Sequence, residues 1–351
     1  MIGLQKWFAA LAMLAVPALC ARAEDPQPPR VLKSFEKPYP TFAKITSNDP
    51  SFDKLIAPGT KVEKLAEGFA WAEGPLWIKH GGFFICSDIP NNAIRKWKDG
   101  EGLSVFLQPS GYTGKTPRGG EPGSNGLTLD PAGHITMCEH GDRRITQLEA
   151  DGKTKKVLAD HYQGKRFNSP NDLVYRSNGD LFFTDPPYGL VKNWDDPARE
   201  LDFCGVFRLT KEGQLTAVIK DLTRPNGVAF SPDGKTLYIA VSDPDNSVYM
   251  AYDMQPDGSV GKGRVFYDMT AWTKEGRPGA PDGMKIDKDG NIWGSGPGGI
   301  YVMSPHGKVL GRIDTGERTA NVAWGDDGST LYLCADQYIC RVKTGTKGAG
   351  W

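Results

Sequence analysis

The chain has 351 residues, and its 42 lysines and arginines balance its 42 aspartates and glutamates. A formal net charge of zero argues against nucleic acid as a partner, because nucleic-acid-binding proteins usually carry an excess of basic residues. The length allows a large buried core, but it is long for one simple domain unless the fold adds repeated units, as a propeller does.

Residues 1–23 have the pattern of a secretory signal peptide. Lys6 precedes an apolar run at 7–19, and Ala21-Arg22-Ala23 matches the small-x-small cleavage motif. The run is too short to span a bilayer comfortably, so we expect a secreted or periplasmic protein without a membrane span. A membrane anchor or a buried N-terminal helix is the alternative. Residues 24–60 are rich in Pro, Lys and Ser, and they are predicted to form an extended arm before a folded body at 61–346.

A strand–turn–strand motif occurs six times in the folded body, with copies about 39 to 56 residues apart, as in propeller arrays. The clearest copy is RPNGVAFSPDGKTLYIA at 224–240. Each copy opens with a polar residue, usually followed by glycine, and has a second polar–glycine step between its two strands. That second step is typical of a hairpin turn.

Two further strands are expected after most copies. Third strands are predicted at 93–97, 144–148, 205–209, 247–252, 299–303 and 338–342. Fourth strands are predicted at 104–107, 155–158, 216–219, 264–267 and 309–313. The sixth copy ends after its third strand, and a separate strand at 61–65 precedes the first copy. The sequence therefore predicts an all-β, six-bladed β-propeller with four-stranded antiparallel blades, closed by this N-terminal strand. An antiparallel β-sandwich is the alternative.

The residues that open the six first strands are predicted to surround one mouth of the central channel: Glu73, Asn125, Asn171, Asn226, Asp282 and Asn321. Four of them (Glu73, Asn171, Asn226 and Asp282) offer two carboxylates and two amide oxygens. Such hard oxygen ligands suit Ca²⁺, with Mg²⁺, Mn²⁺ or Zn²⁺ as alternatives. The alternative interpretation is that each polar–glycine step only caps a tight corner.

The second strand of each copy is expected to return to the same mouth, and five of the six end there in an acidic residue or Glu-His: Asp88, Glu139-His140, Asp185, Asp243 and Asp336. His140 and Asp185 are candidate substrate contacts, together with Asn125 and Asn171. His140 could also shuttle a proton. Loop capping by Asp and a purely structural His are the alternatives. The loops at 111–123 and 190–201 are expected to form pocket walls.

Five cysteines follow the expected cleavage site: Cys86, Cys138, Cys204, Cys334 and Cys340. Their odd number leaves at least one thiol free, and the sequence leaves open whether any disulfide forms. No CxxC pair or Cys/His cluster indicates zinc.

The motifs EGPLW, SNGLTLDPAG, FNSPNDLVYRSNGDLFFTDPPYGL, RPNGVAFSPDGKTLYIA and PDGMKIDKDGNIW resemble the gluconolactonase/regucalcin-like (senescence marker protein) family. NSPNDLV and TDPPYG are similar to its bacterial gluconolactonase branch. The resemblance runs from about Glu67 to Val342. It implies a six-bladed propeller with a divalent metal, usually calcium, at the channel mouth and lactone hydrolysis as the activity.

The resemblance also implies roles for individual residues. Glu73, Asn226 and Asp282 match the family's metal ligands, and Asn171 matches a position that binds metal or substrate. Asp282 also matches the proposed proton acceptor and donor. We therefore expect a gluconolactonase-like hydrolase of a small sugar lactone, in which the metal polarises the carbonyl and Asp282 is general base and acid. Two alternatives stay open: a phosphotriester (organophosphate) hydrolase on the same metal, and a non-catalytic periplasmic propeller that binds sugar acids.

Overall fold

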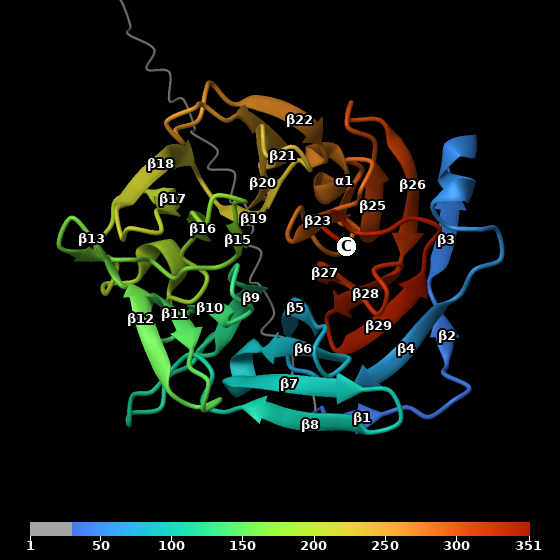
Figure 1. The fold of residues 1–351 in the computed structure, drawn as a ribbon, viewed down its shortest axis with the longest axis horizontal. Coiled ribbons are helices and arrows are strands. Elements are labelled where there is room, and N and C mark those ends of the chain that lie inside the picture. Colours follow the sequence, from blue (N-terminus) through green and yellow to red (C-terminus); the bar gives the residue numbers. More distant parts are fainter. Residues whose placement is uncertain (1–29) are drawn as a thin grey trace, which may run out of the picture. The chain divides into compact units, whose positions relative to one another are not determined.

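Six antiparallel sheets surround a central channel, with their first strands β5, β9, β15, β19, β23 and β27 innermost (Figure 1). The computed structural model describes residues 30–351, so the predicted signal peptide at 1–23 lies outside the described residues. Residues 31–351 form a single unit. Among residues 30–351, no helix is long and apolar enough to span a membrane.

The six blades are numbered here in chain order. Blade 1 contains β5 (Ala72–Ile78), β6 (Phe83–Asp88), β7 (Ala93–Lys98) and β8 (Gly102–Leu107). Blade 2 contains β9 (Ser124–Leu129), β10 (Ile135–Glu139), β11 (Arg144–Leu148) and β12 (Lys155–Ala159). Blade 3 contains β15 (Leu173–Tyr175), β16 (Leu181–Asp185), β17 (Cys204–Leu209) and β18 (Leu215–Leu222).

The second half of the chain repeats this arrangement. Blade 4 contains β19 (Pro225–Phe230), β20 (Thr236–Asp243), β21 (Asn246–Asp253) and β22 (Arg264–Asp268). Blade 5 contains β23 (Met284–Ile286), β24 (Ile292–Gly296), β25 (Gly299–Met303) and β26 (Val309–Asp314). Blade 6 contains β27 (Thr319–Gly325), β28 (Thr330–Ala335), β29 (Tyr338–Lys343) and β4 (Val62–Glu67).

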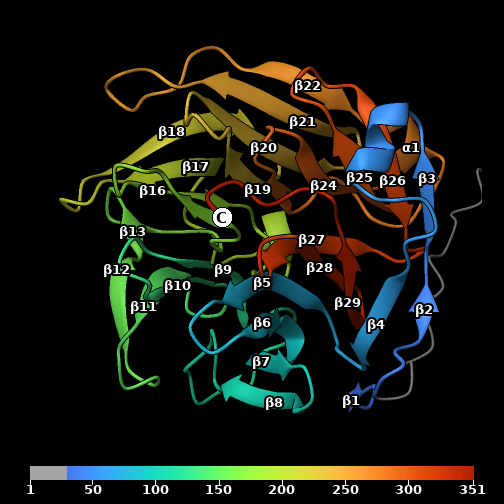
Figure 2. The same cartoon turned by 45° about the vertical axis from the view of Figure 1, so that its right-hand side comes forward.

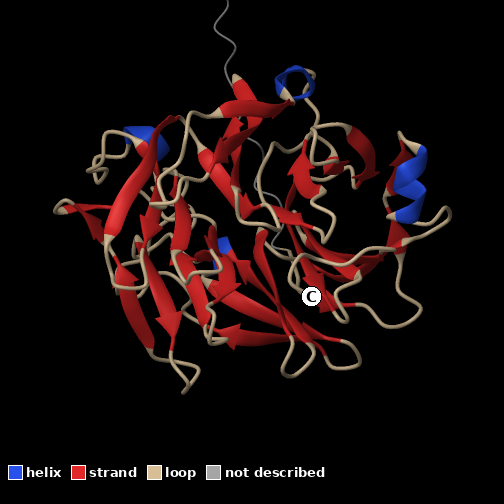
Figure 3. Cartoon of the chain, turned by 45° about the horizontal axis from the view of Figure 1, so that its top comes forward, coloured by secondary structure: helices blue, strands red, loops and turns tan. Residues whose placement is uncertain are grey.

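Helical and minor elements are short, as Figure 3 shows. They are a small hairpin, β13 (His161–Tyr162) with β14 (Lys165–Arg166), the helix α1 (Thr270–Lys274), and the 3₁₀ turns η1 (Pro50–Lys54), η2 (Ile89–Asn91) and η3 (Asn193–Asp195).

Ring closure follows the prediction. β4 comes from the start of the folded unit and pairs antiparallel with β29, the last strand of the chain, with Val62 opposite Val342. The pairing supplies the fourth strand that the sixth repeat lacks. The six-bladed propeller predicted from the sequence is thereby confirmed, and the ring has no open seam between its first and last blades.

The predicted arm is part of the folded sheets. β1 (Lys33–Ser34) and β2 (Thr41–Phe42) add to the outer side of β4, and β3 (Lys44–Ser47) adds to β26 (Figure 2). Phe52 of η1 is buried against Gly311, where an added Cβ would lie 2.6 Å from the Phe52 ring. The arm therefore covers the outer edges of blades 5 and 6, and edges of this kind otherwise invite pairing with other chains.

The hydrophobic core is divided among the interfaces between blades. Within the described residues each neighbouring pair of blades shares one buried apolar cluster. In β16, Phe182 packs toward blade 4 and Phe183 toward blade 2, because successive strand residues point to opposite faces. All five cysteines in the described part of the chain are buried and free, so no disulfide links the blades.

Candidate active site

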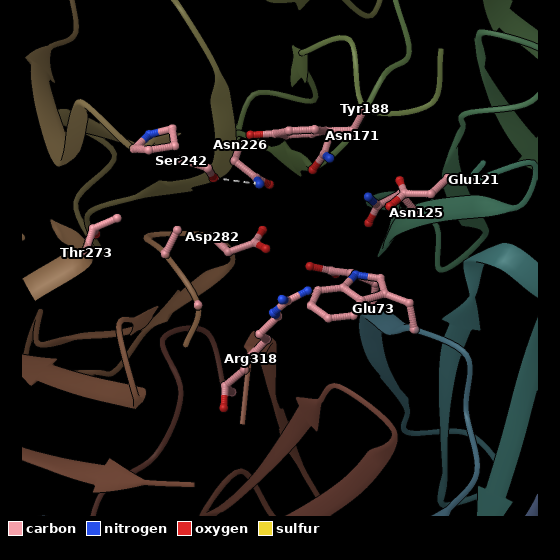
Figure 4. A pocket seen from close by; sticks show the side chains of 15 residues that line it. Glu73, Glu121, Asn125, Asn171, Tyr188, Asn226, Ser242, Thr273, Asp282 and Arg318 are labelled. Carbon is pink, nitrogen blue, oxygen red and sulfur yellow. Dashed lines mark hydrogen bonds between the residues drawn. The ribbon is translucent and has the colours of Figure 1, made fainter. Parts of the chain in front are cut away.

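A cavity of about 350 Å³ opens at one mouth of the channel (Figure 4). Five of the six predicted mouth residues line it: Glu73, Asn125, Asn171, Asn226 and Asp282. The sixth, Asn321, lies behind Glu73 and donates a hydrogen bond from its Nδ2 to Glu73 Oε2 at 3.1 Å. Residues spread over more than two hundred positions therefore meet because each one opens the innermost strand of its blade.

Four of the six mouth residues are followed by a glycine (Gly74, Gly126, Gly227 and Gly283), and close packing between blades requires these glycines. A Cβ added to Gly74 would lie 2.0 Å from the Asn125 carbonyl oxygen, and one added to Gly227 would lie 2.1 Å from the Asp282 carbonyl oxygen. The backbone of each blade thus presses directly on its neighbour at the mouth. The alternative that these steps merely cap tight corners does not describe Gly227, whose φ is not positive.

Two wall asparagines are held with their oxygens toward the cavity. Asn226 Nδ2 donates to Ser242 Oγ at 2.9 Å, and Ser242 Oγ donates to the Pro281 carbonyl at 2.6 Å. Asn125 Nδ2 lies 3.2 Å from His140 Nε2. Among the described residues, no donor reaches Asn125 Oδ1 or Asn226 Oδ1, although both oxygens are buried. A buried acceptor without a donor is uncommon, and it fits a site meant for a cation or a substrate hydroxyl.

Two of the three carboxylates that line the cavity, Glu73 and Asp282, repel each other. Burial, and then the charge of Asp172, raise the pKa of Glu73 to about 7. Burial, and then the charge of Glu73, raise the pKa of Asp282 well above its usual range. Neither carboxylate forms an ion pair with a lysine or arginine in the described part of the chain. A dication between them would remove this repulsion, because a nearby positive charge favours the ionised form.

The donor chemistry fits a hard dication. Glu73, Asn171, Asn226 and Asp282 supply only oxygen, two of them as carboxylates and two as amides, which is the ligand type that Ca²⁺ prefers. Within residues 30–351, no group of three or more His, Cys, Asp or Glu side chains is placed to hold a metal. The site therefore suits oxygen coordination and lacks the nitrogen and sulfur ligands typical of structural zinc.

Two predicted substrate contacts lie behind the wall and do not line the cavity. His140 is fully buried beneath Asn125. Asp185 is also fully buried, and its carboxylate accepts hydrogen bonds from the Asn168 and Ser169 backbone N–H groups at 2.8 and 2.7 Å. Burial raises the pKa of Asp185 to about 7. Asp185 thus holds the segment that leads into Asn171, and the wall contact itself is made by Asn171.

Several wall residues were not identified from the sequence. Seven come from loops between strands: Trp71, Glu121, Tyr188, Pro244, Gly279, Ala280 and Arg318. The other three are Ser242 of β20, Thr273 of α1 and Thr319 at the start of β27. Arg318 is the one basic side chain among the described residues that line this cavity. The expected wall loop 111–123 contributes Glu121, whereas the loop 190–201 contributes none of the lining residues. Tyr188 lies in the TDPPYG motif, and no role was predicted for this tyrosine.

Comparison with known proteins gives a consistent result. The family model described as SMP-30/Gluconolactonase/LRE-like region matches residues 71–337. A gluconolactonase of Zymomonas mobilis is 40% identical over 313 residues, which cover 88% of each chain. A diisopropyl-fluorophosphatase of Loligo vulgaris is 27% identical over 259 residues, which cover 70% of this chain and 78% of that one.

A solved gluconolactonase structure from Xanthomonas campestris is 27% identical, with a TM-score of 0.76, and the match covers 90% of this chain and 99% of that one. The fold, the repeat motifs and the extent of these matches agree over nearly the whole described chain. This chain belongs to the SMP-30/gluconolactonase/LRE-like family.

Proposed function

We propose that this protein is a metal-dependent lactonase that hydrolyses a sugar lactone in the cavity at the channel mouth. The observation that carries the proposal is the meeting of a buried carboxylate (Glu73), a half-buried carboxylate (Asp282) and amide oxygens that face the cavity on one wall, without a basic ion-pair partner among the described residues. The 40% identity to a gluconolactonase along most of both chains supports the choice of a lactone as substrate.

Four residues would hold the ion: Glu73, Asn171, Asn226 and Asp282. A dication bound there would polarise the lactone carbonyl and offset the negative charge that develops on its oxygen. We favour Ca²⁺ because all four side chains offer hard oxygen atoms and because two carboxylates balance its charge. Mg²⁺, Mn²⁺ and Zn²⁺ are the competing ions.

Asp282 is the proposed general base and acid. Its backbone N–H donates to Ser295 Oγ at 2.9 Å, which fixes the residue just before β23. Its carboxylate faces the cavity (Figure 4), where it would accept a proton from the attacking water. It would then return that proton to the ring oxygen that leaves as an alkoxide. One lactone and one water thus give one hydroxy acid.

Removal and restoration of the metal tests this function. The purified protein is assayed by pH-stat for hydrolysis of glucono-lactone before chelation, after chelation, and after addition of Ca²⁺, Mg²⁺, Mn²⁺ or Zn²⁺ separately. We expect chelation to abolish turnover above the uncatalysed rate and Ca²⁺ to restore most of it. Full activity in protein shown by elemental analysis to be metal-free would contradict the proposal.

A phosphotriester hydrolase is the second candidate, because the Loligo vulgaris relative is a diisopropyl-fluorophosphatase. A panel of lactones and organophosphates at equal concentration separates the two activities. We expect the larger kcat/KM on a lactone. Binding of a sugar acid without turnover of either class would instead support a binding protein.

We also propose that the protein is secreted or periplasmic, on the strength of the pattern in residues 1–23. N-terminal sequencing of the mature protein after expression in a bacterium should begin at Glu24. A mature protein that still begins at Met1 and stays in the cytoplasmic fraction would contradict this.

A further inference from the structure

Three side chains stand in series from the edge of the cavity into the wall. Glu121 lines the cavity with 32% of its side chain exposed, and its Oε2 lies 3.0 Å from His140 Nδ1. The angle of this close contact does not make it a hydrogen bond, so Nδ1 has no hydrogen-bond partner among the described residues. On the other side of the ring, His140 Nε2 lies 3.2 Å from Asn125 Nδ2. The series ends at Asn125 Oδ1, which is buried and has no donor among the described residues.

The chemistry of the three groups fixes their roles. A carboxylate only accepts, so the imidazole proton belongs on Nδ1, beside Glu121. With the proton on Nδ1, Nε2 presents a lone pair, and this lone pair can receive the N–H of the Asn125 amide, whose Nδ2 lies 3.2 Å away. The Asn125 amide is thereby prevented from flipping, and its oxygen is left facing the cavity.

His140 is fixed in position by its burial and by contacts with two neighbouring segments. His140 is fully buried, and its backbone N–H donates to the Gly123 carbonyl at 3.1 Å. A Cβ added to Gly189 would lie 2.6 Å from His140 Cβ, so the TDPPYG segment packs directly on it. The neighbouring blade element and the loop that carries Glu121 thus hold His140 from two sides.

We propose that His140 and Glu121 are positioning residues that lock Asn125 as a hydrogen-bond acceptor for a hydroxyl group of the lactone. This inference rests on the proposed lactonase function. His140 acts through Asn125, because it does not line the cavity. The device selects polyhydroxylated lactones over lactones that lack hydroxyl groups, since a substrate hydroxyl would satisfy an otherwise unpaired buried oxygen.

The comparison with Asn226 explains why Glu121 belongs to the device. The Asn226 amide is also tethered through its Nδ2, but that tether ends at Ser242 and the fixed Pro281 carbonyl. The Asn125 tether ends at a carboxylate on the cavity wall. Orientation of Asn125 is therefore coupled to a group that the bound substrate can approach.

The test is a selectivity ratio measured with the metal-loaded, full-length protein. kcat and KM are determined for glucono-δ-lactone and for δ-valerolactone, which has the same ring without hydroxyl groups. In His140→Leu we expect the ratio of the two kcat/KM values to fall about tenfold, the effect of one lost hydrogen bond. The fall should appear in KM for the hydroxylated lactone.

Three variants make the result specific. His140→Gln, whose side-chain oxygen can take the place of Nε2, should recover most of the ratio. Thr136→Val, at a fully buried position on the same strand β10 but outside the cavity wall, should leave the ratio unchanged. Glu121→Ala should lower the ratio in the same direction and remains informative if His140→Leu does not fold, which circular dichroism would reveal.

Equal losses on both lactones, or a Gln variant no better than Leu, would overturn the positioning role while leaving the lactonase intact. Absence of turnover by the metal-loaded wild type would contradict the proposed function itself. In that event calorimetry with gluconate and with unsubstituted 5-hydroxypentanoate still tests the positioning role. We expect His140→Leu to weaken gluconate binding selectively, and equal weakening of both acids would overturn it.

Discussion

Most repeats contain two glycine steps, one at the channel mouth and one in the turn between the first two strands, and these steps differ in what requires the glycine. At the channel mouth, Gly227 has an ordinary φ and presses on the Asp282 backbone of the next blade. At the far end of the same kind of strand, Gly133 has a φ of +90° and open space around it. The first glycine is required by the neighbouring blade, and the second by the conformation of its own turn.

Polar residues that precede glycines at these two places in the repeat differ in the same way: Asp282 precedes Gly283 at the mouth, and Asp233 precedes Gly234 in a turn. Asp282 faces a cavity shared by several blades, whereas Asp233 bonds its own turn at Ser231 and Lys235. The position of a residue in the repeat therefore shows whether it faces the shared cavity or only shapes a local turn. Each of the following experiments tests this difference between mouth residues and turn residues.

The largest expected effect is on activity. Asp282→Asn should lower kcat on a lactone by about 10³-fold, because the amide cannot accept the water proton. The matched turn variant Asp233→Asn should keep kcat within a factor of about two, as expected for a surface change away from the site. Steady-state kinetics measures kcat for both variants, and circular dichroism checks that each variant is folded. Near-normal turnover by Asp282→Asn would show that Asp282 is not the general base.

The next effect is the stability contributed by the ion. An ion bound only by the folded ring stabilises it by about 3 kcal/mol at a concentration 100-fold above its Kd. Chelation should therefore lower the melting temperature of the wild type by several degrees in calorimetry, and Glu73→Gln should reduce that difference. A melting temperature that changes neither with chelator nor with added Ca²⁺ would argue that no ion binds at the mouth.

The third effect compares the two glycines directly. Gly227→Ala should destabilise the protein by about 3 kcal/mol, since the new methyl group meets a backbone carbonyl that cannot move away. Gly133→Ala should cost only about 1 kcal/mol, the penalty of a positive φ for alanine. Urea unfolding of both variants gives the values, and equal losses would erase the distinction drawn here.

Much of the fold followed from periodicity. Strand patterns, turn residues and the missing fourth strand of the last repeat predicted the blades and the closure by β4. The mouth residues followed from their equivalent places in the repeats, and five of them line the cavity. The reason is that equivalent residues of successive repeats lie at equivalent places around the central channel of a propeller.

Other features carry no such periodicity. Glu121, Tyr188 and Arg318 lie in loops of different lengths, so no equivalent position in another blade points to them. The pairing of β3 with β26 joins segments far apart in the chain through four residues without a distinctive pattern. His140 looked like a wall residue because its strand ends at the mouth, but its bond to Asn125 places it one layer deeper.

The pairing of β4 with β29 also has a consequence for how the chain folds. Most paired strands of the propeller are close to each other in the sequence. β4 and β29 also belong to one blade, but they lie more than 270 residues apart in the sequence. Bringing the two together carries the largest loop-closure entropy in the fold, so blade 6 should assemble last and set the folding rate. Until then the outer edge of β29 is unpaired, and a chain that lacks residues 1–67, and with them β4, should tend to aggregate during refolding.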